Sequence, residues 1–245
     1  MELKDILLAI SIGLLPSLIW LVFFLREDAH KEPKLMILKV FIAGALISLV
    51  AVAFQYASQN ILGFLRVEKY AFVSILVLAA LEEVLKFLAA YFIIVRSKFF
   101  DEPIDAMIYM IVVALGFAAL ENVFIALNSV FQNGWNTNDL FGTLIFRFIG
   151  ATLLHALSSA IVGYYWAKKF ILDNAPMITN IEKRDIAEDL IMQGIIFASL
   201  LHAIFNFLII RFSDILVYPT IFLTIIALFV FWNFEKIKRY YRLSI

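Results

Sequence analysis

Seven long apolar runs constrain this chain more than any other feature of its sequence. Each run has about the 20 residues that a helix needs to cross the hydrocarbon core of a bilayer. Backbone N–H and C=O groups inside a bilayer must pair within their own segment, so we expect every run to be a helix. The runs cover residues 6–25, 35–56, 71–95, 104–130, 140–167, 190–211 and 215–234.

The composition agrees with a membrane protein. Of the 245 residues, 64% are hydrophobic, whereas a soluble domain is about half apolar. The formal net charge is zero, so charge gives no argument for a nucleic-acid partner. The absence of cysteine excludes disulfides, thiolate metal sites and a cysteine nucleophile. We predict an all-α, polytopic transmembrane helical bundle of about seven spans, in which residues 1–245 form a single integral membrane domain.

The distribution of Lys and Arg predicts the orientation of the chain. The first run follows residues of both charge signs and shows no small-residue cleavage pattern before Arg26, so we interpret it as a span rather than a signal peptide. With the N-terminus outside, fourteen Lys and Arg residues fall on the inner side and four on the outer side. This bias follows the positive-inside rule. It predicts an N-terminus outside and a C-terminus inside.

Ionisable residues are concentrated in the third to sixth spans. A charged side chain at the middle of a bilayer costs about 2.5–3.5 kcal/mol on insertion scales, and such residues usually face each other or a water-filled cavity. The first, second and seventh spans carry none at their middles. We therefore expect residues 71–211 to contain the catalytic core helices. The residues concerned are Glu82, Glu83, Lys86, Glu121, Arg147, His155 and His202.

The third span contains two adjacent carboxylates and a lysine. Glu82 lies four residues and Glu83 three residues before Lys86, so either carboxylate can reach the ammonium group. Lys86 can hold one carboxylate as an ion pair, which leaves the other as a candidate general base acting on water. The alternative is a structural ion pair with a spare carboxylate. The position at mid-span favours a functional role.

The fourth span places an acid after a run of small residues. Gly116 and the two alanines that follow Phe117 allow close helix approach. Glu121 and Asn122 can then meet a neighbouring helix rather than lipid. A packing motif with an incidental polar pair is the alternative.

The fifth and sixth spans each contain a histidine with a polar residue one turn later. His155 shares a face with Ser159, and His202 shares a face with Asn206. We do not assign Ser159 as a nucleophile, because two residues four apart on one helix rarely have the geometry for attack. Asn206 suits a role in orienting the substrate or stabilising an oxyanion.

Helical rise tests whether these groups lie at one depth. At about 1.5 Å per residue, Glu83 lies about 18 Å from the start of its run, and His202 lies about 18 Å from the start of its own. Both are near mid-membrane. Glu121 and His155 reach the same depth only if the hydrocarbon begins near Tyr109 and Ile145, which the charges permit.

Taken in order, these motifs resemble those of the PrsW family of intramembrane proteases, a relative of the CAAX prenyl endopeptidases and bacteriocin-processing proteins. The resemblance covers about residues 71–210. It rests on Glu82-Glu83-x-x-Lys86, the stretch from Asp101 to Asn122, the helix with Arg147 and His155, and His202-x-x-x-Asn206. It departs from the family at Ile125, where a Tyr is common, and at Asn206, where an Asp is common.

The resemblance implies cleavage of a membrane-anchored protein, such as an anti-sigma factor, by paired Glu and His residues. Glu82 or Glu83 would activate water and Glu121 and His155 would assist. The scissile carbonyl would be polarised by His202 and Asn206, and Lys86, Asn122 and Arg147 would have supporting roles.

Metal use stays open at the level of sequence. Two histidines and a carboxylate can hold zinc together with a water ligand, and the candidate ligands are Glu83, His155 and His202. The same groups can also run a metal-free hydrolysis based on glutamate.

We predict an intramembrane endopeptidase of a prokaryotic cell membrane, with the lipid bilayer and a membrane-anchored protein or peptide as its partners. A prenyl-protein endopeptidase is one alternative and an ion-coupled transporter is another, although transporters usually show internal repeats and broken helices. A third alternative is a scaffold that has kept the fold without the activity.

Overall fold

The computed structural model describes residues 3–28, 30–68, 70–133, 147–174, 180–212 and 215–244. Within these ranges the chain forms seven α-helices and one π-helical turn, and no strand. The helices are α1 (Leu3–Phe24), α2 (Lys34–Phe64), α3 (Phe72–Ile94), α4 (Pro103–Asn133), α6 (Leu153–Asp173), α7 (Asn180–Arg211) and α8 (Val217–Ser244), and the π-helical turn is η1 (Phe148–Thr152). The all-helical prediction is confirmed, while the start of the predicted fifth run, residues 140–146, lies outside the described residues.

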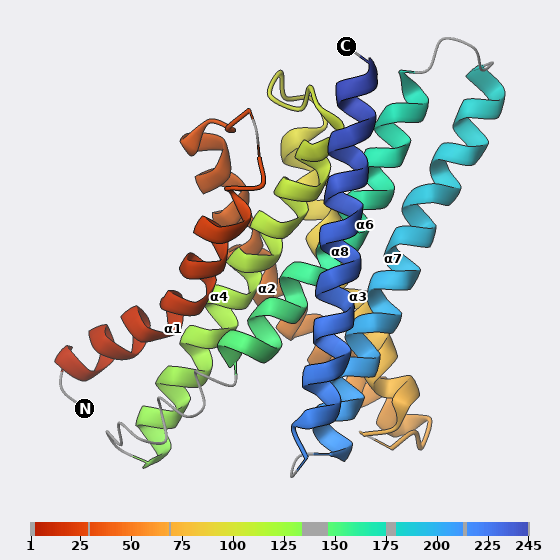
Figure 1. Cartoon of the computed structure of the whole chain (residues 1–245). Helices are drawn as coiled ribbons and strands as arrows, with labels where there is room; N and C mark the ends of the chain where they lie inside the picture. The colour runs from red at the N-terminus through yellow and green to blue at the C-terminus, as the bar shows by residue number, and fades with distance from the viewer. Residues whose placement is uncertain are drawn as a thin grey trace.

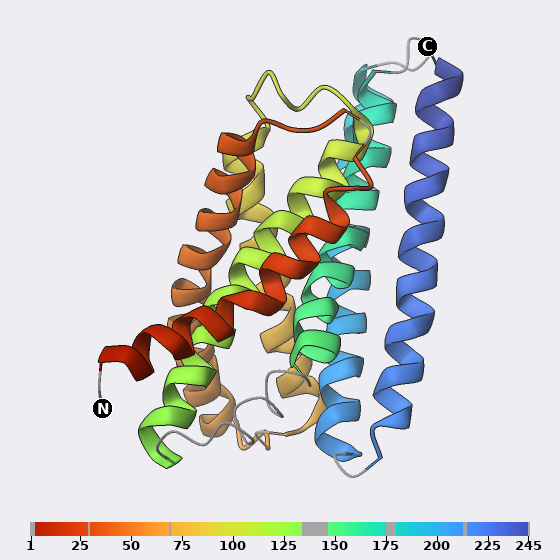
Figure 2. The same cartoon turned by 60° about the vertical axis from the view of Figure 1, so that its left-hand side comes forward.

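The helices form one bundle whose two chain ends lie toward opposite ends of it (Figure 1). Among the described residues, six helices are long and apolar enough to cross a membrane, and α3 is the α-helix that does not meet this test. Its 23 residues suffice in length, but its three charged residues, Glu82, Glu83 and Lys86, are more than the two that the test allows. Because α3 packs against α2 and α7 and lies beside other helices of the bundle (Figure 2), we treat it as a crossing too. The direction of the termini across the membrane stays a prediction.

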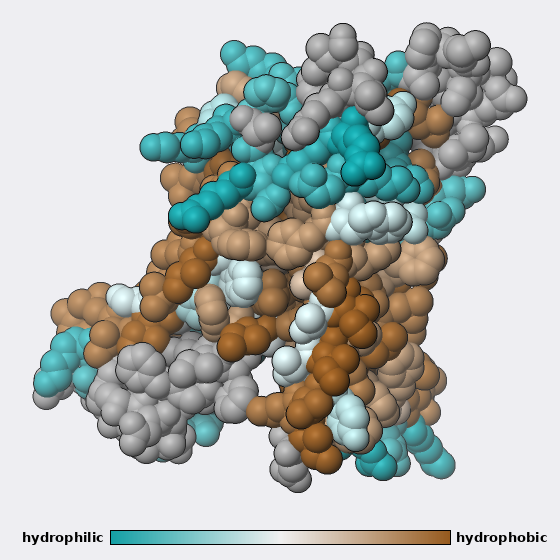
Figure 3. All heavy atoms as spheres, in the orientation of Figure 1, coloured by the Kyte–Doolittle hydropathy of each residue, from teal (hydrophilic) through white to brown (hydrophobic). Residues whose placement is uncertain are grey.

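The surface divides into an apolar belt and a polar end. In Figure 3, hydrophilic residues gather at the end of the bundle where α8 finishes, and hydrophobic residues cover the middle. Large apolar side chains point outward from this belt, among them Leu46, Phe92 and Leu228, at 59%, 74% and 67% exposure. A soluble protein would not expose so continuous an apolar surface. The belt therefore faces lipid.

Several helices are longer than the apolar runs that predicted them. The predicted end of the second run is residue 56, but α2 continues to Phe64, and α7 begins at Asn180 rather than at residue 190. The 31 residues of α2 span about 46 Å, against about 30 Å of hydrocarbon. Hydropathy detects the lipid-facing part of a helix and misses the polar turns that extend it.

Helix α4 is the centre of the bundle and packs against α1, α2 and α6. Close approach to α2 depends on two glycines. A Cβ atom on Gly44 would lie 2.0 Å from the Val113 carbonyl oxygen, and one on Gly116 would lie 1.9 Å from that of Phe41. The small residues before Glu121 thus bring the helices together, as the sequence predicts. On α6, Gly163 packs equally closely on α4, with a Cβ position 2.6 Å from Met107 Cα.

Candidate active site

The polar residues predicted from the sequence converge inside the bundle from four helices. Helix α3 provides Glu82, Glu83 and Lys86, and these lie opposite residues from α4, α6 and α7. Glu83 and Lys86 are fully buried, and His155 and His202 are 4% and 2% exposed. The remaining members are Glu121 and Asn122 on α4, His155 on α6, Asn206 on α7 and Arg147 just before η1.

Glu83 is held by hydrogen bonds on both carboxylate oxygens. Its Oε1 accepts bonds from Lys86 Nζ at 2.7 Å and from Ser158 Oγ at 3.0 Å, and it lies 2.9 Å from His202 Nδ1. Its Oε2 accepts a bond from Ser159 Oγ at 2.9 Å. With both carboxylate oxygens hydrogen-bonded, Glu83 serves as a fixed anion. Ser159, which the sequence argued against as a nucleophile, is a hydrogen-bond donor here.

Glu82, its neighbour in sequence, has a different environment. Its Oε1 accepts a hydrogen bond from Gln55 Nε2 at 2.6 Å, whereas its Oε2 is buried and has no hydrogen-bond partner among the described residues. That oxygen lies 3.9 Å from His155 Nδ1 and 3.7 Å from His202 Nε2. A buried carboxylate oxygen without a donor is costly. It is therefore the atom of the site most in need of a ligand.

Each histidine has one ring nitrogen bonded to a carboxylate. His155 Nε2 lies 3.1 Å from Glu121 Oε2, and His202 Nδ1 lies 2.9 Å from Glu83 Oε1. Lys86 Nζ donates to His155 Nδ1 at 2.9 Å. Since a lysine ammonium has no lone pair, Nδ1 is the acceptor, and the proton of a neutral His155 sits on Nε2 and points at Glu121. Each histidine thus has its other nitrogen directed toward Glu82.

These residues fit a divalent metal ion. Glu82, His155 and His202 each offer a ligand atom, and the three atoms lie within 4.8 Å of one another. An ion on His155 Nδ1 would replace the hydrogen bond that this atom accepts from Lys86. Metal-bound histidines commonly donate their second N–H to a carboxylate, the role that Glu121 and Glu83 fill here. The sequence proposed Glu83 as the carboxylate ligand, but its four contacts leave it no free oxygen. Adjacent residues on a helix point about 100° apart, so Glu83 contacts His202 Nδ1 while Glu82 faces His155 Nδ1 and His202 Nε2.

Glu121 also belongs to a second polar network, which includes the supporting residues. Arg147 Nη2 lies 3.1 Å from Glu121 Oε2, and Arg147 Nε donates to Asn122 Oδ1. Asn122 Nδ2 in turn donates to Thr152 Oγ1 at 3.0 Å. Thr152 closes η1, three residues before His155. This network joins α4 to the start of α6 and fixes Glu121 against His155.

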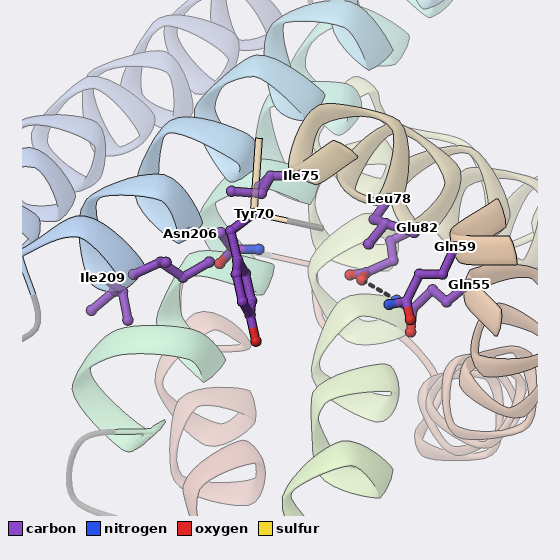
Figure 4. A pocket seen from close by; sticks show the side chains of 9 residues that line it. Gln55, Gln59, Tyr70, Ile75, Leu78, Glu82, Asn206 and Ile209 are labelled. Atoms are coloured by element: carbon purple, nitrogen blue, oxygen red, sulfur yellow. Dashed lines mark hydrogen bonds between the residues drawn. The ribbon is translucent and has the colours of Figure 1, made fainter. Parts of the chain in front are cut away.

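Asn206 lies apart from that hydrogen-bonded cluster, on the wall of a cavity of about 280 Å³. No hydrogen bond of its side chain occurs within the described part of the chain. Figure 4 shows Asn206 and Tyr70 facing the cavity from one side and Glu82, Gln55 and Gln59 from the other. The structure therefore brings Asn206 to the same cavity as Glu82, but not into contact with it.

Three polar residues of the site gave no signal in the sequence. Ser158 and Thr152 look like small packing residues, and Gln55 lies in a span without ionisable residues at its middle. Gln55 nevertheless donates to Glu82 across 27 positions of sequence. The one available signal was its position inside an apolar run, where an amide is unusual.

A second acidic group lies away from the site, near the α1–α2 and α3–α4 turns. Glu32, Asp101 and Asp105 offer oxygens within 4.8 Å of one another. Tyr109 donates to Glu32, and Asp105 accepts the backbone N–H groups of Asp101 and Glu102 at 3.1 and 2.7 Å. Burial raises the pKa of Glu32 above its usual range. These bonds tie the two turns together, so we interpret the group as structural.

Comparisons with known proteins agree with this geometry. The family described as PrsW family intramembrane metalloprotease matches residues 32–233. A protein named Protease PrsW from Oceanobacillus iheyensis is 27% identical over 93% of this chain and 94% of its own length. Its namesake from Geobacillus kaustophilus is 35% identical over 65% of each chain, and that from Bacillus subtilis is 27% identical over 94% of each. No solved structure matches the chain. The chain, an intramembrane protease, therefore belongs to the PrsW family.

Proposed function

We propose that this protein is an endopeptidase of a prokaryotic cell membrane that hydrolyses a peptide bond in a membrane-anchored protein. Residues 71–211 form its catalytic core. The observation that carries the proposal is the unpartnered Oε2 of Glu82, which lies near two histidines, while Glu82 itself lines a cavity. The bacterial origin of the related proteases supports the location.

We assign Glu82, His155 and His202 as the residues that would hold a divalent metal ion such as zinc. When bound, the ion would polarise the scissile carbonyl and lower the pKa of a water molecule. Glu121 and Glu83 act on this set from outside, because each fixes the ring orientation and the tautomer of one histidine.

Glu82 has the central role in handling the proton. When Oε2 holds an ion, the ion would activate the water; without an ion, the same oxygen can take a proton as the water oxygen attacks the carbonyl carbon. The same carboxyl group returns that proton to the leaving nitrogen when the C–N bond breaks. Gln55 orients Glu82 by donating to its other oxygen.

Asn206 stabilises the charge that develops on the substrate. As the carbonyl oxygen becomes an oxyanion, the Asn206 amide donates a hydrogen bond from the opposite side of the cavity (Figure 4). Lys86 is less suited to this task, since its ammonium is already bonded to Glu83 and His155.

The alternatives from the sequence receive less support. The relatives are named Protease PrsW, which favours neither a transporter nor a prenyl-protein endopeptidase. A scaffold without activity does not account for a buried carboxylate oxygen left unpaired between two histidines, because such an arrangement costs stability.

The test uses the full chain in liposomes with a library of single-span peptides. Each peptide carries a randomised juxtamembrane segment between a fluorophore and a quencher. We expect hydrolysis by the native chain, loss with Glu82→Gln, and loss after chelation that zinc restores. Bound zinc, measured by elemental analysis, should fall in Glu82→Gln and remain in Ser199→Ala, a substitution outside the site. Hydrolysis that survives Glu82→Gln refutes the assigned role, and hydrolysis that survives complete metal removal refutes the metal site.

A further inference from the structure

A groove leads from Glu82 along α2 and α3 to the turn that joins them. The cavity that contains Glu82 and Asn206 adjoins a second one, of about 290 Å³, and the two share Gln59 and Leu78 as lining residues. The second cavity extends to Gly63 and Ser74. Both are open rather than sealed, and together they line α2 and α3 from Glu82 to Gly63 and Ser74.

The two walls of this groove are α2 and α3, which run antiparallel and keep a constant register. On α2, Gln55, Gln59 and Gly63 are spaced four residues apart and share one face. On α3, Ser74, Leu78 and Glu82 do the same. All six line the groove. Gln55 is bonded to Glu82, so Gln59 lies level with Leu78 and Gly63 with Ser74.

The groove is polar where the surrounding surface is apolar. Gln59 and Asn60 are exposed, beside apolar neighbours such as Val52 and Ile61, which expose 52% and 60% of their surfaces. An amide that faces hydrocarbon leaves donors and acceptors unpaired. Such residues are stable here only if the groove holds water or a polar chain.

Position 63 is open space. A Cβ atom added to Gly63 would have no neighbour within 4 Å, in contrast to Gly44 and Gly116, where it would meet backbone. Glycine here does not permit close helix packing. It keeps the groove wide at the point farthest from Glu82.

From this geometry we infer that the groove between α2 and α3 binds an extended segment of the substrate polypeptide and leads it to Glu82. Glutamine side chains both donate and accept hydrogen bonds, so Gln59 can pair with the N–H and C=O groups of an extended peptide in a place where lipid cannot. The inference rests on the proposed proteolytic function. It adds the route of approach and names Gln59 as a positioning residue for the substrate.

The length of the groove sets the size of the bound segment. Eight residues separate Gln55 from Gly63, which corresponds to about 12 Å along α2. An extended chain rises about 3.3 Å per residue. The groove therefore accommodates about four residues on one side of the scissile bond.

The chain contains no cysteine, so a single thiol can be introduced and modified after folding. Gly63→Cys and the control Ile61→Cys are placed separately in the full chain and reconstituted with the peptide library described above. Residues two apart on a helix are rotated by about 200° relative to each other. Position 61 therefore faces away from the groove that position 63 lines. Each thiol is then coupled to a bulky maleimide, and hydrolysis is compared with the rate of the same variant before coupling.

We expect coupling at position 63 to reduce hydrolysis at least about tenfold, while coupling at position 61 changes it little. A membrane-impermeant thiol reagent should also react faster at position 63, because that position contacts water. Equal rates before and after coupling at position 63, with the native chain active, refute the groove and leave the proposed function intact. A native chain that hydrolyses no member of the library refutes the proposed function and with it the role of the groove.

Discussion

Substitution of the two adjacent glutamates should have different effects: one change should lower stability and the other should abolish activity. Glu83→Gln removes a fully buried anion whose Oε1 lies 2.7 Å from the fully buried Lys86 ammonium. Breaking a buried ion pair from one side costs about 3–5 kcal/mol, because the remaining charge is uncompensated. Glu82 Oε2 is 4.0 Å from the same ammonium and compensates part of that charge. We therefore expect a loss toward the lower end of this range.

Glu82→Gln should behave in the opposite way. The glutamine keeps an acceptor for Gln55 and removes a carboxylate oxygen that has no partner in the described structure. Its free energy of unfolding should lie within about 1 kcal/mol of the native value, while hydrolysis is lost. The assay is reversible unfolding in mixed micelles with increasing dodecyl sulfate, followed by the fluorescence of the four tryptophans and paired with the liposome assay.

A double substitution tests the cause of the instability. Lys86→Met alone leaves Glu83 as a buried unpaired anion, so it should destabilise as well. Glu83→Gln combined with Lys86→Met removes both charges and should cost less than the sum of the two single changes. Additive losses, or equal destabilisation by Glu82→Gln and Glu83→Gln, would contradict the division of roles between the two carboxylates.

Three further substitutions test other parts of the molecule. Asn206→Ala should lower kcat by about 10²–10³ without lowering the free energy of unfolding, since it removes an oxyanion donor that makes no hydrogen bond in the described structure; a change confined to KM would refute that role. Gly116→Ala should destabilise the protein by about 1–3 kcal/mol, because its Cβ would lie 1.9 Å from the Phe41 carbonyl oxygen. Gly63→Ala, with open space around its Cβ, should be neutral or stabilising by up to about 1 kcal/mol in the same unfolding assay. Similar losses of unfolding free energy in Gly116→Ala and Gly63→Ala would contradict the packing argument.

The sequence alone determined the class of fold and predicted most of the candidate site residues. A bilayer forces every apolar run of about 20 residues into a helix, so the helices follow from hydropathy with little help from tertiary contacts. The cost of charge in the same medium singled out residues such as Glu82, His155 and His202. The exact helix ends did not follow, because α2 and α7 continue past their apolar runs through polar residues, where hydropathy gives no signal.

Only the tertiary structure distinguished the environments of the two adjacent glutamates. Glu82 and Glu83 are chemically identical neighbours, and no periodicity distinguishes them. The packing of α6 and α7 against α3 gives Glu83 the hydrogen bonds of Ser158, Ser159 and Lys86 and its contact with His202, and leaves Glu82 facing the cavity. From helical rise, Glu121 and His155 reach one depth only if the hydrocarbon begins at particular residues. Their 3.1 Å contact shows that the two side chains lie at the same level of the bundle.

The contact between α2 and α3 illustrates what the sequence cannot predict. Gln55 meets Glu82 because two antiparallel helices align in one register, which is a property of the helix pair and not of either helix. Local rules such as rise, periodicity and transfer free energy act within a segment. Contacts between segments depend on how glycines such as Gly44 and Gly116 let backbones approach, and that is decided only when the whole bundle packs.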